Sequence, residues 1–285
     1  MARPAPAVTS GIGTHTKGDT DMSNANGTGV TKLFEDAHAE GILSPAGLQT
    51  LTVVDLGAQI QAGLGIHVDD VQASEVVLVT VMPDDSGSIS HAGHTKTVCD
   101  GHNLVLDALL ASQQKDGVLF HTRYLNGHVL NPFRPLEDVV RMHSKNYSAD
   151  MGTPLYDQAV VLLGTVLAKA QEFSGNGVPV RTVTLLITDG ADAGSQKARA
   201  KDVAALVKDL QRVENHIVAA MGIDDGVTDF RRVFQEMGIS DRWILTPGQS
   251  AQEIRAAFQV FSQSAVRVSQ GAASFSRTAL GGFGA

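Results

Sequence analysis

The sequence predicts one α/β domain, built on a doubly wound, mostly parallel six-stranded sheet with one antiparallel edge strand. Segments of strand length alternate along the chain with segments of helical periodicity, which is typical of parallel strands joined by right-handed crossovers. The segments 75–82 and 182–188 are rich in β-branched residues, as in strands covered on both faces. The pair Asn126-Gly127 lies between two apolar runs and predicts a β-hairpin, and hence the antiparallel strands.

The chain divides into four segments by composition and periodicity. Its start is rich in Gly, Ser, Thr and Asn, so it has few large side chains whose burial would offset the entropy lost on ordering. A later helix opens with Ser44-Pro45, an N-cap followed by proline at the first helical position. The expected segments are a disordered tail at 1–30, a helical extension at 31–73, the domain at 74–272 and a flexible C-terminal tail at 273–285.

Within these segments the apolar periodicity changes type in a regular order. Helical stretches carry apolar residues at spacings of three and four, and strands are short continuous runs bounded by polar or turn residues. The expected helices cover 31–40, 44–62, 89–112, 155–173, 198–215, 229–237 and 250–268, and the expected strands cover 75–82, 118–125, 128–130, 182–188, 217–223 and 243–245.

Composition argues against several classes of function. The 22 Lys and Arg residues are outnumbered by 30 Asp and Glu residues, and the net charge of −8 has the wrong sign for a protein that coats nucleic acid. The single cysteine, Cys99, forms no intramolecular disulfide, which fits a reducing compartment. No apolar stretch approaches the ~20 residues of a membrane span. We therefore expect a cytoplasmic protein whose partner is neither nucleic acid nor membrane.

Polar side chains that suit a metal ion follow two buried strands and open one helix. The carboxyl ends of parallel strands lie at the same edge of a sheet, where doubly wound proteins bind their ligands. The side chains comprise two carboxylates and three hydroxyls, and Mg²⁺, or Mn²⁺ in its place, prefers such hard oxygens in octahedral geometry. The candidate metal ligands are Asp84, Ser86, Ser88, Thr153 and Asp189.

The spacing of the first three candidates has a mechanical basis. In an Asp-x-Ser-Gly-Ser run, alternate residues of a tight loop can turn their oxygens to one side, while glycine allows an unusual backbone angle. An alternative is that the two serines and Thr153 only cap the helices that follow them. Capping does not explain why Asp189 ends a second buried strand, so the pattern favours a metal site.

Three motifs in this order resemble the metal-ion-dependent adhesion site of von Willebrand factor A domains, and the resemblance covers about residues 74–268. The motifs are Asp84-x-Ser86-Gly87-Ser88 after a strand, Gly152-Thr153-Pro154-Leu155 before a helix and Thr188-Asp189-Gly190 after a second strand. The second motif, Asp224-Asp225-Gly226 and the closing Phe261-Ser262-Gln263-Ser264 are similar to bacterial intracellular members, including those associated with tellurium resistance. The first run departs from the pattern only in having a second acidic residue, Asp85.

The resemblance implies roles for these residues and for the protein. In the family pattern, Ser86, Ser88 and Thr153 contact the metal directly. Asp84 and Asp189 act largely through water, and a carboxylate of a partner protein completes the coordination. The chain would then be a metal-dependent protein-interaction module, an adaptor in a bacterial intracellular complex and not an enzyme. Its partner would present Asp or Glu and would be a protein kinase, a phosphatase or an AAA+ ATPase.

Two other functions stay open on the sequence. The helical extension at 31–73 could pack on a neighbour, which would make the chain a self-associating assembly subunit. A Mg²⁺-dependent phosphohydrolase of the haloacid dehalogenase type would use Asp84 as its nucleophile, but wants a second Asp two residues later, where this chain has Ser86. The sequence also lacks a glycine-rich phosphate loop with Lys and a paired nucleophile and base.

A group of histidines follows the candidate metal loop. On one helix His91, His94, Cys99 and His102 would lie within about 140° of arc, but the last is about 16 Å from the first along the axis, so one ion cannot bind all four. Only His91 and His94 could share a metal. We expect these histidines to be solvated or to face a partner, and Cys99 to be a small core residue.

A second acidic run follows the strand expected at 217–223. It contains Asp224, Asp225 and Asp229. We expect a solvated loop and an Asp helix cap here rather than a second ion site.

Overall fold

The computed structural model describes residues 22–52 and 56–284, besides Met1. Its strands are β1 (Val76–Met82), β2 (Val118–Arg123), β3 (Val129–Pro135), β4 (Val180–Thr188), β5 (His216–Gly222) and β6 (Ile244–Leu245). They form one six-stranded sheet in the order β3-β2-β1-β4-β5-β6, and every neighbouring pair is parallel except β2 and β3. This confirms the predicted doubly wound, mostly parallel sheet with one antiparallel edge strand.

The two central strands are apolar because layers of helices cover both faces of the sheet. Every residue of β1 and of β4 is buried. A continuous apolar strand of this kind is stable only between two covering layers. The two strands pair in parallel from Val76 with Val180 to Met82 with Leu186. Their carboxyl ends therefore lie side by side, at the edge where the candidate metal ligands follow.

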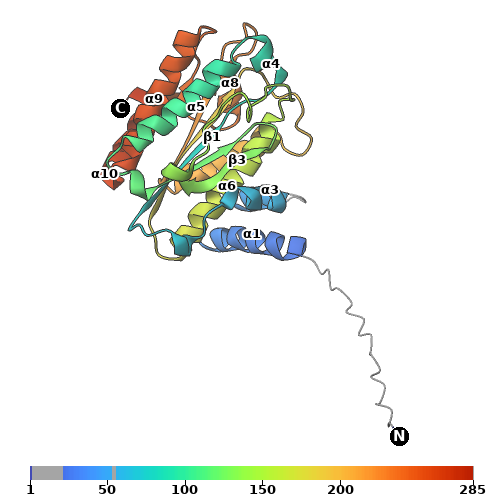
Figure 1. Ribbon diagram of the computed structural model, residues 1–285, viewed down its shortest axis with the longest axis vertical. Coiled ribbons are helices and arrows are strands. Elements are labelled where there is room, and N and C mark those ends of the chain that lie inside the picture. Colours follow the sequence, from blue (N-terminus) through green and yellow to red (C-terminus); the bar gives the residue numbers. More distant parts are fainter. Residues whose placement is uncertain (2–21, 53–55, 285) are drawn as a thin grey trace.

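Ten α-helices of the described residues surround this sheet (Figure 1). They are α1 (Met22–Ala39), α2 (Pro45–Leu51), α3 (Leu56–Leu64), α4 (Gly87–His91), α5 (Thr95–Leu110), α6 (Leu155–Gly175), α7 (Ala200–Arg212), α8 (Phe230–Glu236), α9 (Ala251–Ser269) and α10 (Ala272–Gly281). Helices α5 and α9 pack together on one face of the sheet, and α6 and α7 pack together on the other. Within the described part of the chain, no helix has the length and apolar character needed to cross a membrane.

Two helices that the sequence predicted as single pieces are each divided. The helix expected at 89–112 is α4 and α5, because Gly93 between them has a positive φ of 73° that ends the first helix. The helix expected at 44–62 is α2 and α3. Ser44 caps α2 as predicted, since its hydroxyl accepts from the amide of Gly47 at 3.1 Å.

The edge strand β3 is longer than the predicted strand at 128–130. It continues to Pro135, and Leu119 of β2 pairs with that proline. Two prolines concealed this strand, because proline donates no ladder hydrogen bond and is confined to the edges of sheets. Here Pro132 and Pro135 lie on the edge strand, which accommodates them.

The N-terminal extension begins earlier than predicted and belongs to the folded unit. Residues 2–21 of the predicted disordered tail lie outside the described residues, but α1 begins at Met22, inside that predicted tail. Val30 and Phe34 are each 1% exposed, because α1 packs on α3 and α6. Their burial offsets the entropy cost of ordering a segment whose composition is otherwise polar.

The predicted flexible tail at 273–285 is instead a packed helix over most of its length. Phe275 of α10 is 2% exposed. After α10, the ring of Phe283 lies 4.9 Å from that of Trp243, edge to face. Two phenylalanines in a run of small residues are a weak periodic signal, which is why the sequence did not reveal this contact.

Candidate metal centre

Three loops meet at the carboxyl edge of the sheet. The first loop is taken as residues 83–88, which follow β1 and include the first two residues of α4, and the third loop, residues 189–199, follows β4. The second loop, residues 148–154, leads into α6. Each of the five predicted ligands lies on one of these loops. The first and third loops meet because β1 and β4 are neighbours in the sheet.

Backbone hydrogen bonds join the second loop to both of the others. The amide of Gly87 donates to the carbonyl of Met151 at 2.9 Å, and the amide of Met151 donates to the carbonyl of Asp85 at 3.0 Å. On the other side, the amide of Ala193 donates to the carbonyl of Thr153 at 2.9 Å. Thr153 is thus held between the two strand-end loops by main-chain contacts.

Asp84 is fully buried and its carboxylate is held by three donors. One oxygen accepts from the amide of Ser86 at 2.7 Å. The other accepts from the hydroxyl of Thr188 at 2.7 Å and from the amide of Asp189 at 3.3 Å. The Tyr147 hydroxyl donates to the carbonyl of Asp84. Both the side chain and the backbone of this aspartate are therefore fixed.

A chain of short hydrogen bonds runs from Ser86 to Asp189. The hydroxyl oxygens of Ser86 and Ser88 are 2.8 Å apart, and the Ser88 hydroxyl donates to a carboxylate oxygen of Asp189 at 2.5 Å. Ser86 and Asp189 are 2% and 4% exposed, whereas Ser88 is exposed. This series of hydrogen bonds therefore connects buried side chains to the surface. Four of the predicted ligands are in direct contact, whereas Thr153 bonds through its backbone to Ala193 of the third loop.

The adjacent aspartates Asp84 and Asp85 have different partners. The Asp85 carboxylate accepts from the amide of Asn126, in the turn between β2 and β3, at 2.9 Å. Only Asp84 bonds to Ser86 and Asp189. The sequence spacing predicted Asp84 rather than Asp85 as the ligand, and these hydrogen bonds are compatible with that prediction.

Burial makes these carboxylates unusually easy to protonate. Desolvation raises the pKa of Asp189 to about 6 and that of Asp85 to about 7, and it also raises the pKa of Asp84. The charged groups that act on them are further carboxylates, including Asp150 and Asp225. No cationic side chain of the described residues contributes to these shifts. A bound divalent cation would supply the missing countercharge.

The donor chemistry fits a hard divalent cation. Hydroxyl and carboxylate oxygens suit Mg²⁺ or Mn²⁺, whereas structural zinc sites favour Cys and His. No group of three or more His, Cys, Asp or Glu within the described ranges could hold a metal ion. The candidate centre, with two carboxylates and three hydroxyls, is not a group of that kind.

Two residues outside the predicted ligand set support Asp84. Thr188 is the last residue of β4, and its place directly before Asp189 was the available signal. Tyr147 carried no signal, because it lies 63 residues from Asp84 along the chain and only the fold brings them together.

A reciprocal pair of caps, also missed, fixes the third loop on α6. The Asp157 carboxylate accepts from the amides of Lys197 at 3.0 Å and Ala198 at 2.6 Å. In return, the Ser195 hydroxyl oxygen accepts from the amides of Tyr156 and Asp157, each at 3.0 Å. These bonds satisfy amides of the first turn of α6, which have no partner within the helix, and hold the second loop against the third.

The histidines that follow the first loop are separated from one another. His102 is fully buried and bonds to the Thr122 hydroxyl at 2.8 Å, which corrects the expectation that it is solvated or faces a partner. His94 is at the N-cap position of α5 without a side-chain capping bond and is only 7% exposed, which also corrects that expectation, while His91 is exposed as expected. Cys99 is half-buried and packs against the core.

The acidic run after β5 matches its prediction. Asp229 caps α8 by accepting from the amide of Arg232 at 3.1 Å. Asp225 is exposed and accepts from the amides of Val227 and Thr228, at 2.9 and 2.6 Å.

Comparisons with known proteins give likenesses of fold at low identity. No family model and no curated protein match the chain. The pilus adhesin SpaC from Lactobacillus rhamnosus GG, in its open conformation, is similar at 13% identity and a TM-score of 0.49, over 69% of this chain and 30% of the adhesin. A von Willebrand factor type A structure from Catenulispora acidiphila is similar at 16% identity and a TM-score of 0.44, over 69% of this chain and 44% of that one.

A third similar structure is proximal thread matrix protein 1 from the mussel byssus, with its metal-ion-dependent adhesion site occupied by zinc. Identity is 18% and the TM-score 0.40, over 68% of this chain and 48% of that protein. The chain spans less than half of the length of all three structures. The fold class rests on the strand order, and the candidate centre rests on its side chains.

Proposed function

We propose that the chain is a metal-dependent protein-interaction module. Mg²⁺, or Mn²⁺ in its place, is held at the strand ends, and an Asp or Glu side chain of a partner protein completes its coordination. The metal ligands are Asp84, Ser86, Ser88, Thr153 and Asp189. The observation that carries this proposal is the contact chain from Ser86 through Ser88 to Asp189, which collects hard oxygens around the buried carboxylates of Asp84 and Asp189.

The charge of the ligand set explains why an acidic partner would bind. Asp84 and Asp189 together carry at most two negative charges, which no more than balance the charge of a divalent cation. The three hydroxyl ligands are neutral, so the ion keeps its affinity for a further anionic oxygen. Ser88 is exposed, which leaves an open side from which a carboxylate could approach.

The small number of carboxylates in the ligand set also favours a small ion. Ca²⁺ takes six to eight oxygens and commonly several carboxylates, whereas Mg²⁺ accepts one or two carboxylates and keeps some waters. Mg²⁺ and Mn²⁺ should therefore support partner binding better than Ca²⁺.

The centre is proposed to bind and not to catalyse. Two residues after Asp84, where a haloacid dehalogenase-type phosphohydrolase wants its second aspartate, the chain has Ser86, whose oxygen lies 2.8 Å from that of Ser88. By the motif resemblance, the partner would be a bacterial protein kinase, phosphatase or AAA+ ATPase and the chain an intracellular adaptor, similar to the members associated with tellurium resistance.

Titration calorimetry with Mg²⁺ and Mn²⁺ tests the metal centre. Ser86→Ala removes a ligand oxygen, so it should weaken binding by at least the roughly 10–100-fold typical of losing a residue that only supports a ligand. Ser90→Ala is the matched control, because Ser90 is an exposed serine of the adjoining helix α4. Unchanged circular dichroism would show that both variants are folded. Equal affinities for the two variants would contradict the assignment.

The interaction itself is tested by capture on the immobilised full chain. A partner retained by the wild type in Mg²⁺ should be lost with chelator and lost with Thr153→Ala. Replacing one interface Asp or Glu of that partner by its amide should weaken binding about as much. Partner binding that is indifferent to chelator would contradict the proposed function.

A further inference from the structure

Arg123, the last residue of β2, is a charged side chain buried in the core. It is 1% exposed and donates to two backbone carbonyls, that of Gly127 at 3.0 Å and that of Gln59 on α3. Among the described residues, the ion pairs that the structure contains do not include Arg123. Burying a charge without a countercharge is costly. The two carbonyl bonds that offset this cost join α3 to the turn between β2 and β3.

The turn held by Arg123 also supports the first metal loop. The amide of Leu125 donates to the carbonyl of Pro83 at 3.0 Å. The amide of Asn126 donates to the carboxylate of Asp85 at 2.9 Å. Two consecutive amides of the turn thus contact the loop that carries three of the candidate ligands. A shift of the turn would move or release that loop.

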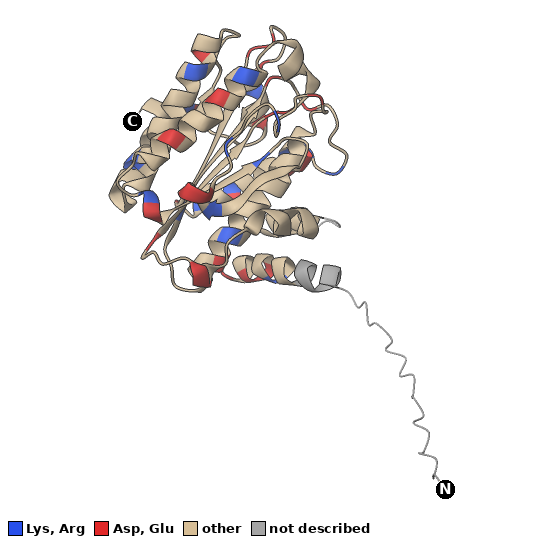
Figure 2. Ribbon diagram, in the orientation of Figure 1, with Lys and Arg blue, Asp and Glu red and all other residues tan. Residues whose placement is uncertain are grey.

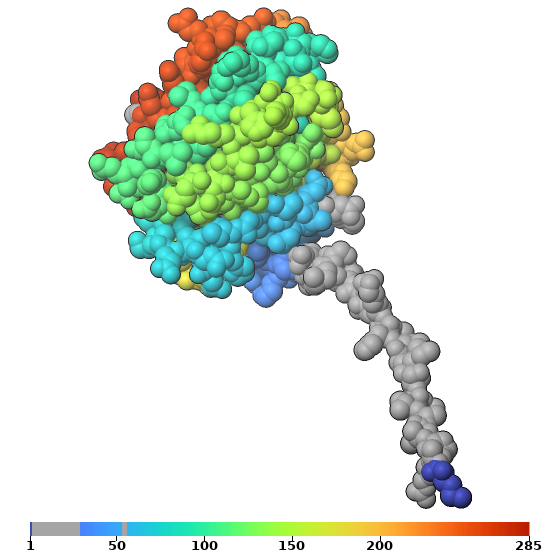
Figure 3. Space-filling view, viewed as in Figure 1, coloured from blue at the N-terminus to red at the C-terminus, as the bar shows by residue number. Residues whose placement is uncertain are grey.

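Helix α3, whose Gln59 carbonyl accepts from Arg123, packs closely against the domain. A Cβ atom placed on Gly63 would lie 2.6 Å from the methyl carbon of Thr165 on α6 and 3.0 Å from the ring of His121 on β2. Glycine is therefore required for this approach. Just after α3, the amide of Ile66 donates to the carbonyl of Phe133 at 2.9 Å. Figure 3 shows the blue atoms of this region directly against the green atoms of the neighbouring surface.

We propose that Arg123 is a positioning residue that makes the affinity of the first loop for metal depend on the docking of α3. This inference rests on the proposed metal function. Helix α3 contributes no ligand and no charged side chain (Figure 2). Its Gln59 carbonyl fixes the guanidinium, the guanidinium fixes the Gly127 carbonyl, and the turn fixes Asp85. Any partner or substitution that lifts α3 would therefore loosen the metal loop.

The test compares two buried cations that both tie the extension to the domain. Arg123→Met removes the donors at similar length, and Arg123→Lys restores one donor. The matched control is Lys169→Met. Lys169 of α6, whose side chain is 1% exposed, donates to the carbonyl of Ile66 and to Glu172. Both residues hold the segment around α3, but only Arg123 has a bond to the turn.

Mn²⁺ affinity is measured by calorimetry on the full chain, at a temperature where circular dichroism shows each variant folded. Arg123→Met should weaken binding about tenfold, a magnitude typical of lost support behind a metal ligand, and Arg123→Lys should recover part of it. Lys169→Met should stay within about twofold of the wild type, whatever its loss of melting temperature. Equal affinities for Arg123→Met and the wild type, or equal weakening by both Met variants, would overturn the inference.

A second readout needs no metal. Hydrogen exchange of the amides of Asn126 and Met151 in the metal-free protein should accelerate in Arg123→Met and not in Lys169→Met. A wild type that binds no metal would refute the proposed function, while the exchange data would still decide the connection from α3 to the loop. Unchanged exchange in Arg123→Met would refute that connection even where metal binds.

Discussion

The two faces of the sheet are covered in different ways. On one face, α5 and α9 form a single layer, and only seven of the 16 residues of α5 are buried. On the other face, α6 lies beneath a second layer made of α1, α2 and α3, and 16 of its 21 residues are buried. Figure 2 shows the consequence in charge, since α5 carries both Lys and acidic residues whereas α3 has none. The N-terminal extension is thus a layer of the domain and not a linker.

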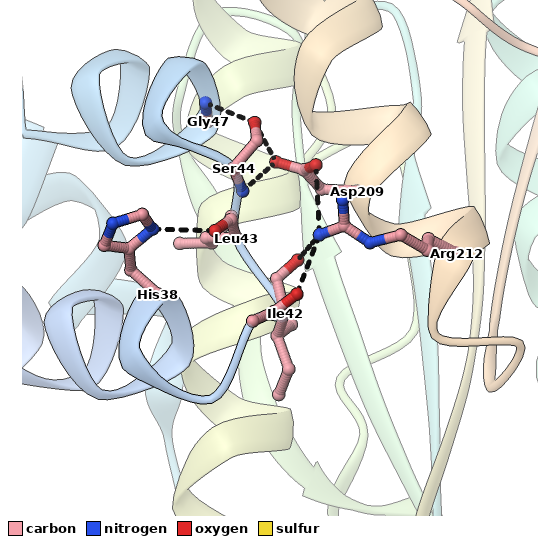
Figure 4. A network of polar contacts seen from close by, with 8 residues as sticks. His38, Ile42, Leu43, Ser44, Gly47, Asp209 and Arg212 are labelled. Carbon is pink, nitrogen blue, oxygen red and sulfur yellow. Dashed lines mark hydrogen bonds and ion pairs between the residues drawn. The ribbon is translucent and has the colours of Figure 1, made fainter.

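A buried polar junction as well as apolar packing holds this second layer in place (Figure 4). Asp209 of α7 is 2% exposed, and one of its carboxylate oxygens accepts from the amide and the hydroxyl of Ser44, at 2.8 and 2.7 Å. The neighbouring Arg212 donates to the carbonyls of Gly41 and Ile42 at 2.8 and 2.9 Å. These hydrogen bonds attach the link between α1 and α2 to helix α7 of the domain.

The largest expected effects come from truncating one apolar anchor on each face. Ile60 of α3 and Phe258 of α9 are both fully buried. Ile60→Ala should lower the free energy of unfolding by about 2–5 kcal/mol and Phe258→Ala by about 3–5 kcal/mol, because each leaves a cavity. If the extension is a layer of the domain, urea unfolding of both variants followed by fluorescence and by circular dichroism gives one coincident transition. A separate early transition in Ile60→Ala alone would show that the extension unfolds independently of the rest of the domain.

A smaller effect is expected at the polar junction. Asp209→Ala should lower the free energy of unfolding by about 1–3 kcal/mol, because it leaves the half-buried amide and hydroxyl of Ser44 without their charged acceptor. Asp100→Ala on α5 is the control on the opposite face. Its partner Lys96 is 82% exposed at the side chain, and such surface pairs contribute about 0.5 kcal/mol or less. Similar urea midpoints for the two variants would show that the junction does not anchor the extension.

A third effect, graded with pH, comes from histidines buried on the two faces. Burial lowers the pKa of His121, which faces α3, to about 3, and that of His102, on α5, to about 4. Between the unfolded value near 6.5 and these values the unfolded chain binds protons that the folded chain does not. The contribution of each histidine to the free energy of unfolding should therefore fall as pH drops below about 6.5, by up to about 1.4 kcal/mol per pH unit. Asp85 and Asp189, whose pKa burial raises, contribute with the opposite sign.

Urea unfolding between pH 7 and 4.5 measures this slope. His121→Gln should change the slope of the free energy of unfolding against pH by the contribution of one histidine. The matched control is His128→Gln, because His128 is exposed in the adjacent turn. An unchanged slope in His121→Gln would mean that His121 does not titrate between the two states as its burial requires.

The sheet and the location of the candidate ligands at one of its edges could both be predicted from the sequence, because both depend on local signals. Apolar runs identify strands, and the carboxyl ends of parallel strands share an edge, so Asp84 and Asp189 could be placed together before their contacts were known. Thr153 was placed by its motif. The contact chain through Ser88 follows from this arrangement.

The second layer was not predicted because its evidence is spread over distant segments. The helix from Leu155 to Gly175 is apolar nearly all round, which is the mark of a helix buried on every side. That pattern could have revealed a covering layer, but not which segment provides it. Arg123 gave no signal at all, since arginine normally lies at the surface and its acceptors are backbone carbonyls.

Crystals grown with Mn²⁺ test the central claim most directly, through an anomalous difference map. The account predicts one strong peak at the carboxyl edge of the sheet, about 2.1 Å from the hydroxyl oxygens of Ser86, Ser88 and Thr153. Asp84 and Asp189 should lie next to it. A peak at the Asp224–Asp225 loop instead, or none at the strand ends at saturating Mn²⁺, would contradict the metal centre.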